Sequence, residues 1–152
     1  MKAEIERKFK AESLPPDILP KAEPGQPIQQ GYLTVSECSE TRVRKKGEKT
    51  FLTVKKGCGL SRMETEVEIT LEQFDALWQA TLGNRVEKVR HNFLLGPGKI
   101  AEIDIFSGEN EGLILIEIEF NDESQASSFQ APDWFGVDVT GNPAYKNQHL
   151  AK

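Results

Sequence analysis

In the segment Glu4-Ile5-Glu6-Arg7-Lys8-Phe9 every even position is charged, by Glu4, Glu6 and Lys8, and two of the three odd positions, Ile5 and Phe9, are apolar. A period of two is the period of a β-strand, in which alternate side chains share one face. The segment therefore predicts a strand that carries two carboxylates and one amine on the same face. Arg7 falls on the other face, where we expect it to be solvated.

The same alternation recurs along the chain, so that charged residues again lie two apart. It is found at residues 41–46, 51–55, 62–69, 86–90, 101–106 and 113–120. Together with residues 30–35, these segments predict about eight strands, separated by turn signals at 47–49, 57–59, 96–98 and 108–112. Because the connections are short, we expect most neighbouring strands to be antiparallel.

Three helices are predicted in addition to the strands. Thr70 and Gln73 form the pattern of a capping box for a helix through about residue 81, and Asp122 with Gln125 does so for a shorter one. Asn142-Pro143 is typical of the start of a third helix, through about residue 150.

The charge on these strands argues for an interior that is polar. On a single strand a charged face is usually solvated, but here nearly every predicted strand has one. Like charges two residues apart lie roughly 7 Å from each other, which is unfavourable without a counter-charge. The helices must cover the apolar strand faces, so the charged faces are left to line a lumen. The sequence therefore predicts an α+β fold, an eight-stranded antiparallel β-barrel with a charged lumen and a few outer helices.

The predicted lumen holds both signs of charge. Its acids are Glu4, Glu6, Glu64, Glu66, Glu68, Glu102, Asp104, Glu117 and Glu119, and its bases are Lys8, Arg42, Arg44, Lys55, Arg62, Lys88 and Arg90. Carboxylates suit Mg²⁺ or Mn²⁺, whereas clusters of Arg and Lys suit phosphate oxygens. Both together fit a complex of a divalent metal with a polyphosphate better than either partner alone.

Composition excludes several other classes of protein. The chain has 152 residues, which suits one domain over residues 1–152, and its net charge of −5 argues against non-specific nucleic-acid binding. No apolar run approaches the roughly 18 residues of a membrane span, and no signal peptide is recognisable. We therefore expect a cytoplasmic protein, with no membrane or nucleic-acid partner, in which Cys38 and Cys58 are free thiols.

Glu4-x-Glu6-x-Lys8 resembles the ExExK signature of the CYTH superfamily, also called triphosphate tunnel metalloenzymes. The order of the later segments strengthens this resemblance. They are Gln30-Gly31-Tyr32-Leu33, Arg42-Val43-Arg44, Thr53-Val54-Lys55, Ser61-Arg62-x-Glu64-x-Glu66, Val86-Glu87-Lys88-x-Arg90, Glu102-Ile103-Asp104 and Glu117-Ile118-Glu119. The similarity covers nearly the whole chain and is greatest to the short bacterial members, which include inorganic triphosphatases.

The resemblance implies an eight-stranded antiparallel tunnel and a role for each matching residue. The implied substrate-binding residues are Lys8, Arg42, Arg44, Lys55, Arg62, Lys88 and Arg90. The implied metal ligands are Glu4, Glu6, Glu64, Glu117 and Glu119, with Glu102 and Asp104 as further candidates. The implied catalytic residues are Lys88, Tyr32, Glu4 and Glu6, since members that cleave tripolyphosphate pair a tyrosine with a lysine.

The function that follows is hydrolysis of inorganic tripolyphosphate with Mg²⁺ or Mn²⁺, by a protein that could form a homodimer. Three alternatives stay open. The first is a class IV-type adenylate cyclase, which makes cyclic AMP from ATP. The second is a thiamine or nucleoside triphosphatase, and the third is a polyphosphate-binding module without catalysis.

Overall fold

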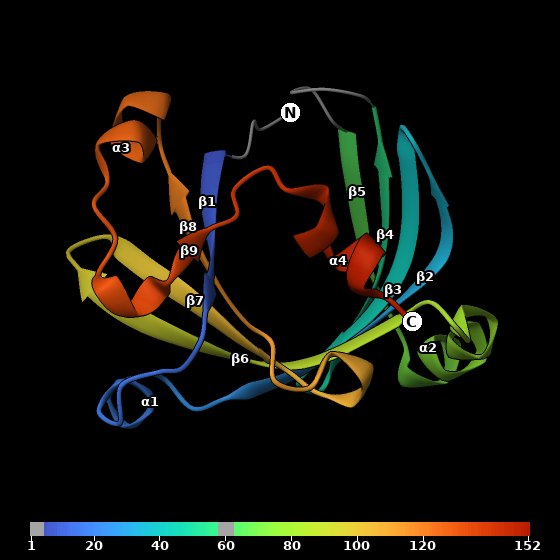
Figure 1. Ribbon diagram of the computed structural model, residues 1–152. Helices are drawn as coiled ribbons and strands as arrows, with labels where there is room; N and C mark the ends of the chain where they lie inside the picture. The colour runs from blue at the N-terminus through green and yellow to red at the C-terminus, as the bar shows by residue number, and fades with distance from the viewer. Residues whose placement is uncertain (1–4, 58–62) are drawn as a thin grey trace. The chain divides into compact units, whose positions relative to one another are not determined.

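The computed structural model describes residues 5–57 and 63–152, so the predicted site residues Glu4 and Arg62 lie outside the described residues. The strands are β1 (Ile5–Ala11), β2 (Gln26–Ser36), β3 (Ser39–Lys46), β4 (Lys49–Lys56), β5 (Met63–Ile69), β6 (Arg85–Gly96), β7 (Lys99–Phe106), β8 (Ile114–Phe120) and β9 (Val137–Asp138). The α-helices are α1 (Ile18–Lys21), α2 (Leu71–Trp78), α3 (Glu123–Ser128) and α4 (Asn147–Leu150) (Figure 1). The 3-10 helices are η1 (Gln79–Thr81), η2 (Gly108–Asn110), η3 (Asp133–Phe135) and η4 (Pro143–Tyr145).

The described residues form a mostly antiparallel β-sheet with few helices, which agrees with the predicted α+β class. The predicted closed barrel of eight strands is wrong. The sheet has nine strands in the order β5-β4-β3-β2-β6-β7-β8-β1-β9, and its two end strands are not paired with each other within the described residues. The ninth strand was missed because β9 has two residues, too few to show alternation, and it takes the free edge of β1.

The chain divides into two compact units. Of the described residues, unit 1 contains Pro27–Glu87 and Ala144–Lys152, and unit 2 contains residues 5–26 and Lys88–Pro143. Unit 1 holds most of β2 together with β3, β4, β5, α2 and α4, whereas β1, β7, β8, β9, α1 and α3 belong to unit 2. Strand β6 enters unit 2 at Lys88. The single domain over residues 1–152 stays a prediction.

The core of unit 2 lies on one face of β7, β8 and β1. Alternate residues of each strand point to this face, as the period of two requires. Its buried members are Phe9, Ala11, Ile18, Ala101, Ile103, Ile116, Ile118, Phe120 and Phe135. Phe135 of η3 meets Phe9 edge to face, with ring centroids 5.2 Å apart. The opposite face of these strands therefore carries most of their charge, namely Glu6, Lys8, Glu102, Asp104, Glu117 and Glu119.

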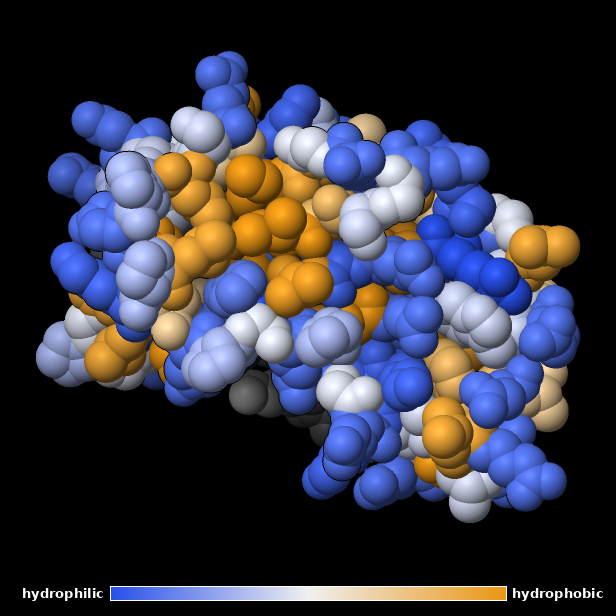
Figure 2. Space-filling model, turned by 90° about the horizontal axis from the view of Figure 1, so that it is seen from below, coloured by the Kyte–Doolittle hydropathy of each residue, from blue (hydrophilic) through white to orange (hydrophobic). Residues whose placement is uncertain are grey.

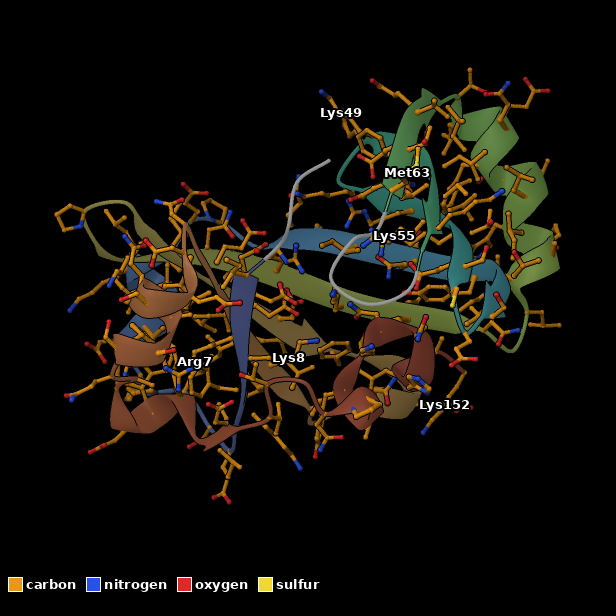
Figure 3. The ribbon with its side chains drawn as sticks, turned by 90° about the horizontal axis from the view of Figure 1, so that it is seen from above. Arg7, Lys8, Lys49, Lys55, Met63 and Lys152 are labelled. Carbon is orange, nitrogen blue, oxygen red and sulfur yellow. The ribbon has the colours of Figure 1, made fainter. Side chains whose placement is uncertain are left out.

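Arg7 is not solvated as predicted, because it ties β1 to the segment after β8. Its NH1 donates to the carbonyl oxygens of Ala126 at 3.0 Å and Phe129 at 2.7 Å, and its NH2 lies 2.9 Å from Asp138. Its guanidinium also lies 5.1 Å from the centre of the Phe9 ring. Figure 3 shows Arg7 and Lys8 on opposite sides of β1. Arg7 is thus a packing residue on the face that Lys8 does not share.

Unit 1 is built on a meander of four strands and one capped helix. Helix α2 has the predicted capping box, in which the Thr70 hydroxyl accepts from Gln73 N at 3.1 Å and the Gln73 side chain accepts from Thr70 N at 2.9 Å. The third predicted helix is interrupted, since η4 ends at Tyr145 and α4 starts after Lys146, whose extended backbone breaks the turn.

The cysteines differ from the sequence-based expectation. Cys38 is disulfide-bonded in this structure, so the expectation that it is a free thiol is wrong, and Cys58 lies outside the described residues.

No helix in the described ranges has the length and apolar character needed to cross a bilayer. Apolar side chains nevertheless gather on part of one face of the molecule (Figure 2).

Candidate functional site

The charged face of unit 2 is a grid whose rows run across four strands. Strand pairing sets the side chains of β6, β7, β8 and β1 opposite one another. One row contains Asn92, Glu102, Glu117 and Lys8, in that order. In the next row Glu119 faces Glu6 across β8 and β1. The predicted residues Glu6, Lys8, Glu117 and Glu119 therefore come together, as their shared parity indicated.

Short ion pairs connect the bases of this face to its acids. Lys8 Nζ lies 3.1 Å from Glu117, and Arg90 NH1 lies 2.7 Å from Glu102. Asp104 receives three contacts, from Lys88 Nζ at 2.8 Å, Arg90 Nε at 2.7 Å and Arg90 NH2 at 2.9 Å. Such a fork between a guanidinium and a carboxylate fixes both groups in one geometry.

Burial and neighbouring charge shift the pKa values of Asp104, Lys88 and Glu102 on this face. Burial alone would raise the pKa of Asp104, but the cations of Lys88 and Arg90 outweigh it and the pKa lies below its usual value. Burial lowers the pKa of Lys88 by more than the attraction of Asp104 raises it. Burial raises the pKa of Glu102, and the carboxylates of Glu117 and Asp104 add to the rise although Arg90 opposes it. A cation beside Glu102 would therefore stabilise its charged form.

Unit 1 carries a second polar face, on β2, β3, β4 and β5. One row contains Tyr32, Arg42, Thr53 and Glu66. The rows beside it contain Gln30 with Arg44, and Glu40 with Lys55 and Glu64. The predicted binding residues Arg42, Arg44 and Lys55 therefore share a face with Tyr32.

The ion pairs of unit 1 are longer than those of unit 2. Arg42 NH1 lies 3.7 Å from Glu40, and Arg44 NH2 lies 3.7 Å from Glu66. The Glu66 carboxylate also accepts from the Thr53 hydroxyl at 2.8 Å. Because charge attraction falls with distance, the pair of Arg42 with Glu40 is weaker than the shorter pairs of Arg90.

Tyr32 has its own hydrogen-bond partner in this face. Gln30 Nε2 donates to the phenol oxygen of Tyr32 at 2.5 Å. Burial is the main cause that raises the pKa of Tyr32 to about 12, although the positive charge of Arg42 opposes it. Tyr32 is therefore a neutral phenol over the physiological range of pH.

The two units divide the predicted site residues between them. Unit 2 brings together Glu6, Lys8, Lys88, Arg90, Glu117 and Glu119, and unit 1 brings together Tyr32, Arg42, Arg44, Lys55 and Glu64. The predicted pair of Tyr32 and Lys88 has one member in each unit. Glu4 and Arg62 are not among the described residues.

Sequence reasoning missed three polar residues of these faces. Gln30 and Glu40 each stand two residues before a predicted site residue, and Asn92 stands two after Arg90. Their parity was the signal, but Gln30 and Asn92 are uncharged, so an alternation of charge does not mark them. Asn92 Oδ1 is buried and has no hydrogen-bond partner, so this row of unit 2 offers one more oxygen acceptor.

The donors fit a hard divalent cation by their chemistry. Glu6 faces Glu119, and Glu117 faces Glu102, so carboxylates meet in pairs across neighbouring strands. Carboxylate oxygens are the ligands that Mg²⁺ and Mn²⁺ prefer. Within residues 5–57 and 63–152, however, no three such side chains are grouped closely enough to hold a metal ion. The described part of the chain thus supplies pairs of ligands, not a complete set.

Comparison with known proteins gives close relatives over nearly the full length, although no family model matches the chain. The inorganic triphosphatase of Nitrosomonas europaea is 44% identical over 149 residues, which cover 97% of this chain and 96% of that protein. The inorganic triphosphatase of Acetivibrio thermocellus is 38% identical, with 100% of this chain and 95% of that protein covered.

Solved structures agree with these relatives. The crystal structure of an inorganic triphosphatase has a TM-score of 0.78 at 40% identity, covering 99% of this chain and 95% of that one. A Hippeastrum protein, described as a putative adenylyl cyclase with a dominant triphosphatase activity, has a TM-score of 0.60 at 18% identity, with 82% of each chain covered. At that identity the second likeness concerns the fold alone.

Proposed function

Since this chain belongs to the CYTH superfamily and, within it, to the inorganic triphosphatases, we propose that it hydrolyses inorganic tripolyphosphate with the help of a divalent metal ion. The observation that best supports the proposal is the mixture of charges on one face of unit 2. There the bases Lys8, Lys88 and Arg90 lie among the carboxylates of Glu6, Glu102, Asp104, Glu117 and Glu119. Such a face suits both partners in a metal–triphosphate complex.

The bases bind phosphate oxygens in this proposal. Arg42, Arg44 and Lys55 form the basic part of unit 1, and a planar guanidinium matches the oxygens of a phosphate by two parallel hydrogen bonds. Unit 2 has its own donors for phosphate oxygens, namely Lys8, Lys88 and Arg90. Positioning of phosphate groups for attack is the main contribution that residues of this kind make to catalysis.

The carboxylates of unit 2 would hold the metal ion, which would be Mg²⁺ or Mn²⁺. Its ligands there would be drawn from Glu6, Glu117 and Glu119, and Glu4 and Glu64 stay ligands predicted from the sequence. When bound, the ion would neutralise phosphate charge and lower the pKa of a coordinated water.

Hydrolysis forms a bond between a water oxygen and the terminal phosphorus and breaks the bond to the bridging oxygen. The products are orthophosphate and pyrophosphate. The attacking water loses one proton to bulk solvent. Lys88 Nζ can donate a proton to the departing pyrophosphate and is then reprotonated from solvent, and burial, which lowers the pKa of Lys88, makes that donation easier.

A phosphate-release assay tests the proposal. Tripolyphosphate, ATP and thiamine triphosphate are compared with Mg²⁺, with Mn²⁺ and with a chelator, and cyclic AMP is measured in parallel. We expect metal-dependent release of orthophosphate from tripolyphosphate. A preference for ATP with a cyclic product would replace the proposal by the cyclase alternative.

Glu6→Gln tests the role of the carboxylates. It keeps the size of the side chain but removes the charge that faces Glu119, so we expect loss of metal-dependent hydrolysis with an unchanged far-UV circular dichroism spectrum. Glu12→Gln, an exposed position just after β1, is the matched control and should keep full activity. Full activity of the Glu6 variant would contradict the proposed metal site.

A further inference from the structure

Gln30 and Tyr32 form a buried polar pair on β2 of unit 1. The two residues stand two apart on one strand and therefore share a face. Gln30 is 1% exposed and Tyr32 is 3% exposed. Their hydrogen bond, from Gln30 Nε2 to the phenol oxygen, is 2.5 Å long. Burying two polar side chains costs desolvation free energy that an apolar pair of the same size would not, so this pair indicates a role besides packing.

The bond from Gln30 leaves the phenol hydrogen of Tyr32 available. A phenol oxygen can accept hydrogen bonds through its lone pairs and can donate its one hydrogen. Gln30 donates to this oxygen, so the O–H of Tyr32 is not used in that bond. Arg42 stands directly opposite Tyr32 on β3 and places a positive charge beside the phenol.

The raised pKa of Tyr32 also favours a role as hydrogen-bond donor. Burial raises its pKa to about 12, so the hydrogen is retained at any physiological pH. A deprotonated phosphate oxygen accepts hydrogen bonds, and Arg42, Arg44 and Lys55 make the face around Tyr32 suited to phosphate. A neutral phenol whose O–H can donate is therefore matched to such an oxygen and unsuited to accept a proton.

We infer that Gln30 is a positioning residue that fixes Tyr32 as a hydrogen-bond donor to a phosphate oxygen of the substrate. Tyr32 then stabilises charge on that oxygen as the phosphorus is attacked, and it does not act as a base. The inference rests on the proposed hydrolysis of tripolyphosphate. It adds Gln30 to the proposed site and makes the Tyr32 hydroxyl a hydrogen-bond donor to the substrate.

A double-mutant cycle tests the coupling between the two residues. The variants are Gln30→Met, Tyr32→Phe and their combination, with Gln29→Met as the matched control because Gln29 is on the other face and bonds to Glu87. We expect Tyr32→Phe to lower kcat roughly a hundredfold, as for loss of one preorganised donor. Gln30→Met should lower kcat about tenfold with KM nearly constant, which corresponds to one neutral hydrogen bond.

The double variant shows whether the effects of the two substitutions on kcat are coupled or independent. If Gln30 acts through Tyr32, adding Gln30→Met to Tyr32→Phe costs nothing further. Losses that multiply in the double variant, or an equal loss in Gln29→Met, would overturn the inference while the wild-type activity still supported the proposed function. A wild-type protein that releases no phosphate would instead remove the proposed function itself.

Absorbance titration supplies a measurement that does not depend on activity. The chain has two tyrosines, so Tyr145→Phe leaves Tyr32 as the only source of phenolate absorbance. We expect this absorbance to appear only well above the usual pKa of tyrosine, and at still higher pH when Gln30→Met is added, because the bond from Gln30 lowers the pKa. Ionisation of Tyr32 near its usual pKa, or an unchanged titration in Gln30→Met, would contradict the inference.

Discussion

Replacing Asp104 by asparagine removes the carboxylate that neutralises two cations of unit 2. Asp104 is 3% exposed, and its oxygens lie 2.8 Å from Lys88 Nζ and 2.7 and 2.9 Å from Arg90. The asparagine has nearly the same shape but keeps only one acceptor oxygen and no charge. The variant therefore isolates the electrostatic part of the contact.

The expected loss in free energy of unfolding depends on which partners Lys88 and Arg90 keep in the variant. Breaking a buried ion pair by removing one member costs about 3–5 kcal/mol. Arg90 keeps Glu102 at 2.7 Å, so the lower end of that range applies. We expect the free energy of unfolding at neutral pH to fall by about 3 kcal/mol, measured by urea denaturation, with the midpoint lowered by roughly 1–3 M.

The pH dependence gives the sign of the effect. The folded-state pKa of Asp104 is lowered, because Lys88 and Arg90 outweigh the effect of burial. Its contribution to stability is therefore complete above the usual carboxyl pKa and is lost as pH falls through the lowered value. The difference between wild type and Asp104→Asn should be full at neutral pH and should shrink in acid.

Asp17→Asn is the matched control for this experiment. Asp17 pairs with Lys21 at 3.2 Å, but its side chain is 62% exposed, so the variant should change stability by about 0.5 kcal/mol or less. An Asp104 variant within about 1 kcal/mol of wild type would refute the reasoning. So would a difference that stays constant from neutral to acid pH.

Two further predictions concern packing in unit 2. Arg7→Met should lower the free energy of unfolding by about 2 kcal/mol, since it loses the bonds to two carbonyl oxygens and to Asp138, yet it should leave kcat of the folded enzyme unchanged; a drop in kcat at temperatures where the variant is fully folded would contradict this. Gly136→Ala should cost about 3 kcal/mol or more in thermal unfolding, because its Cβ would overlap the Lys10 carbonyl oxygen at a φ of 80°. The control Gly112→Ala, at a φ of 94° with open space around it, should cost only about 1 kcal/mol from backbone strain, and equal losses would argue against the overlap.

The faces of the strands could be predicted because alternation is a local property. In β1 the even residues Glu6 and Lys8 lie opposite buried Phe9, and in β8 the even residues Ile116 and Ile118 are buried whereas Glu117 faces the charged side. The caps of α2 and α3 were also predicted, because each depends on two residues three apart. Short-range patterns of this kind are complete within the sequence itself.

The remaining features depend on contacts between distant segments. The bonds of Arg7 to Ala126 and Phe129 join residues more than a hundred positions apart, and its place in a strand gave no sign of them. β9 exists because Val137 and Asp138 meet an edge of β1, not because their sequence favours a strand. Homodimer formation, the cytoplasmic location and the identity of the metal stay predictions from the sequence.

Distances decide which predicted bases are free to exchange partners. In unit 2 Lys88 and Arg90 are held by Asp104 and Glu102 at 2.7 to 2.9 Å, so a phosphate oxygen must compete with short, buried ion pairs. In unit 1 Arg42 lies 3.7 Å from Glu40, where an exchange of a carboxylate for a phosphate loses less. We therefore expect substitutions of Arg42 to act mainly on KM. Those of Lys88 and Arg90 should act on stability and KM together, because the same ion pairs that organise the charged face also hold unit 2 together.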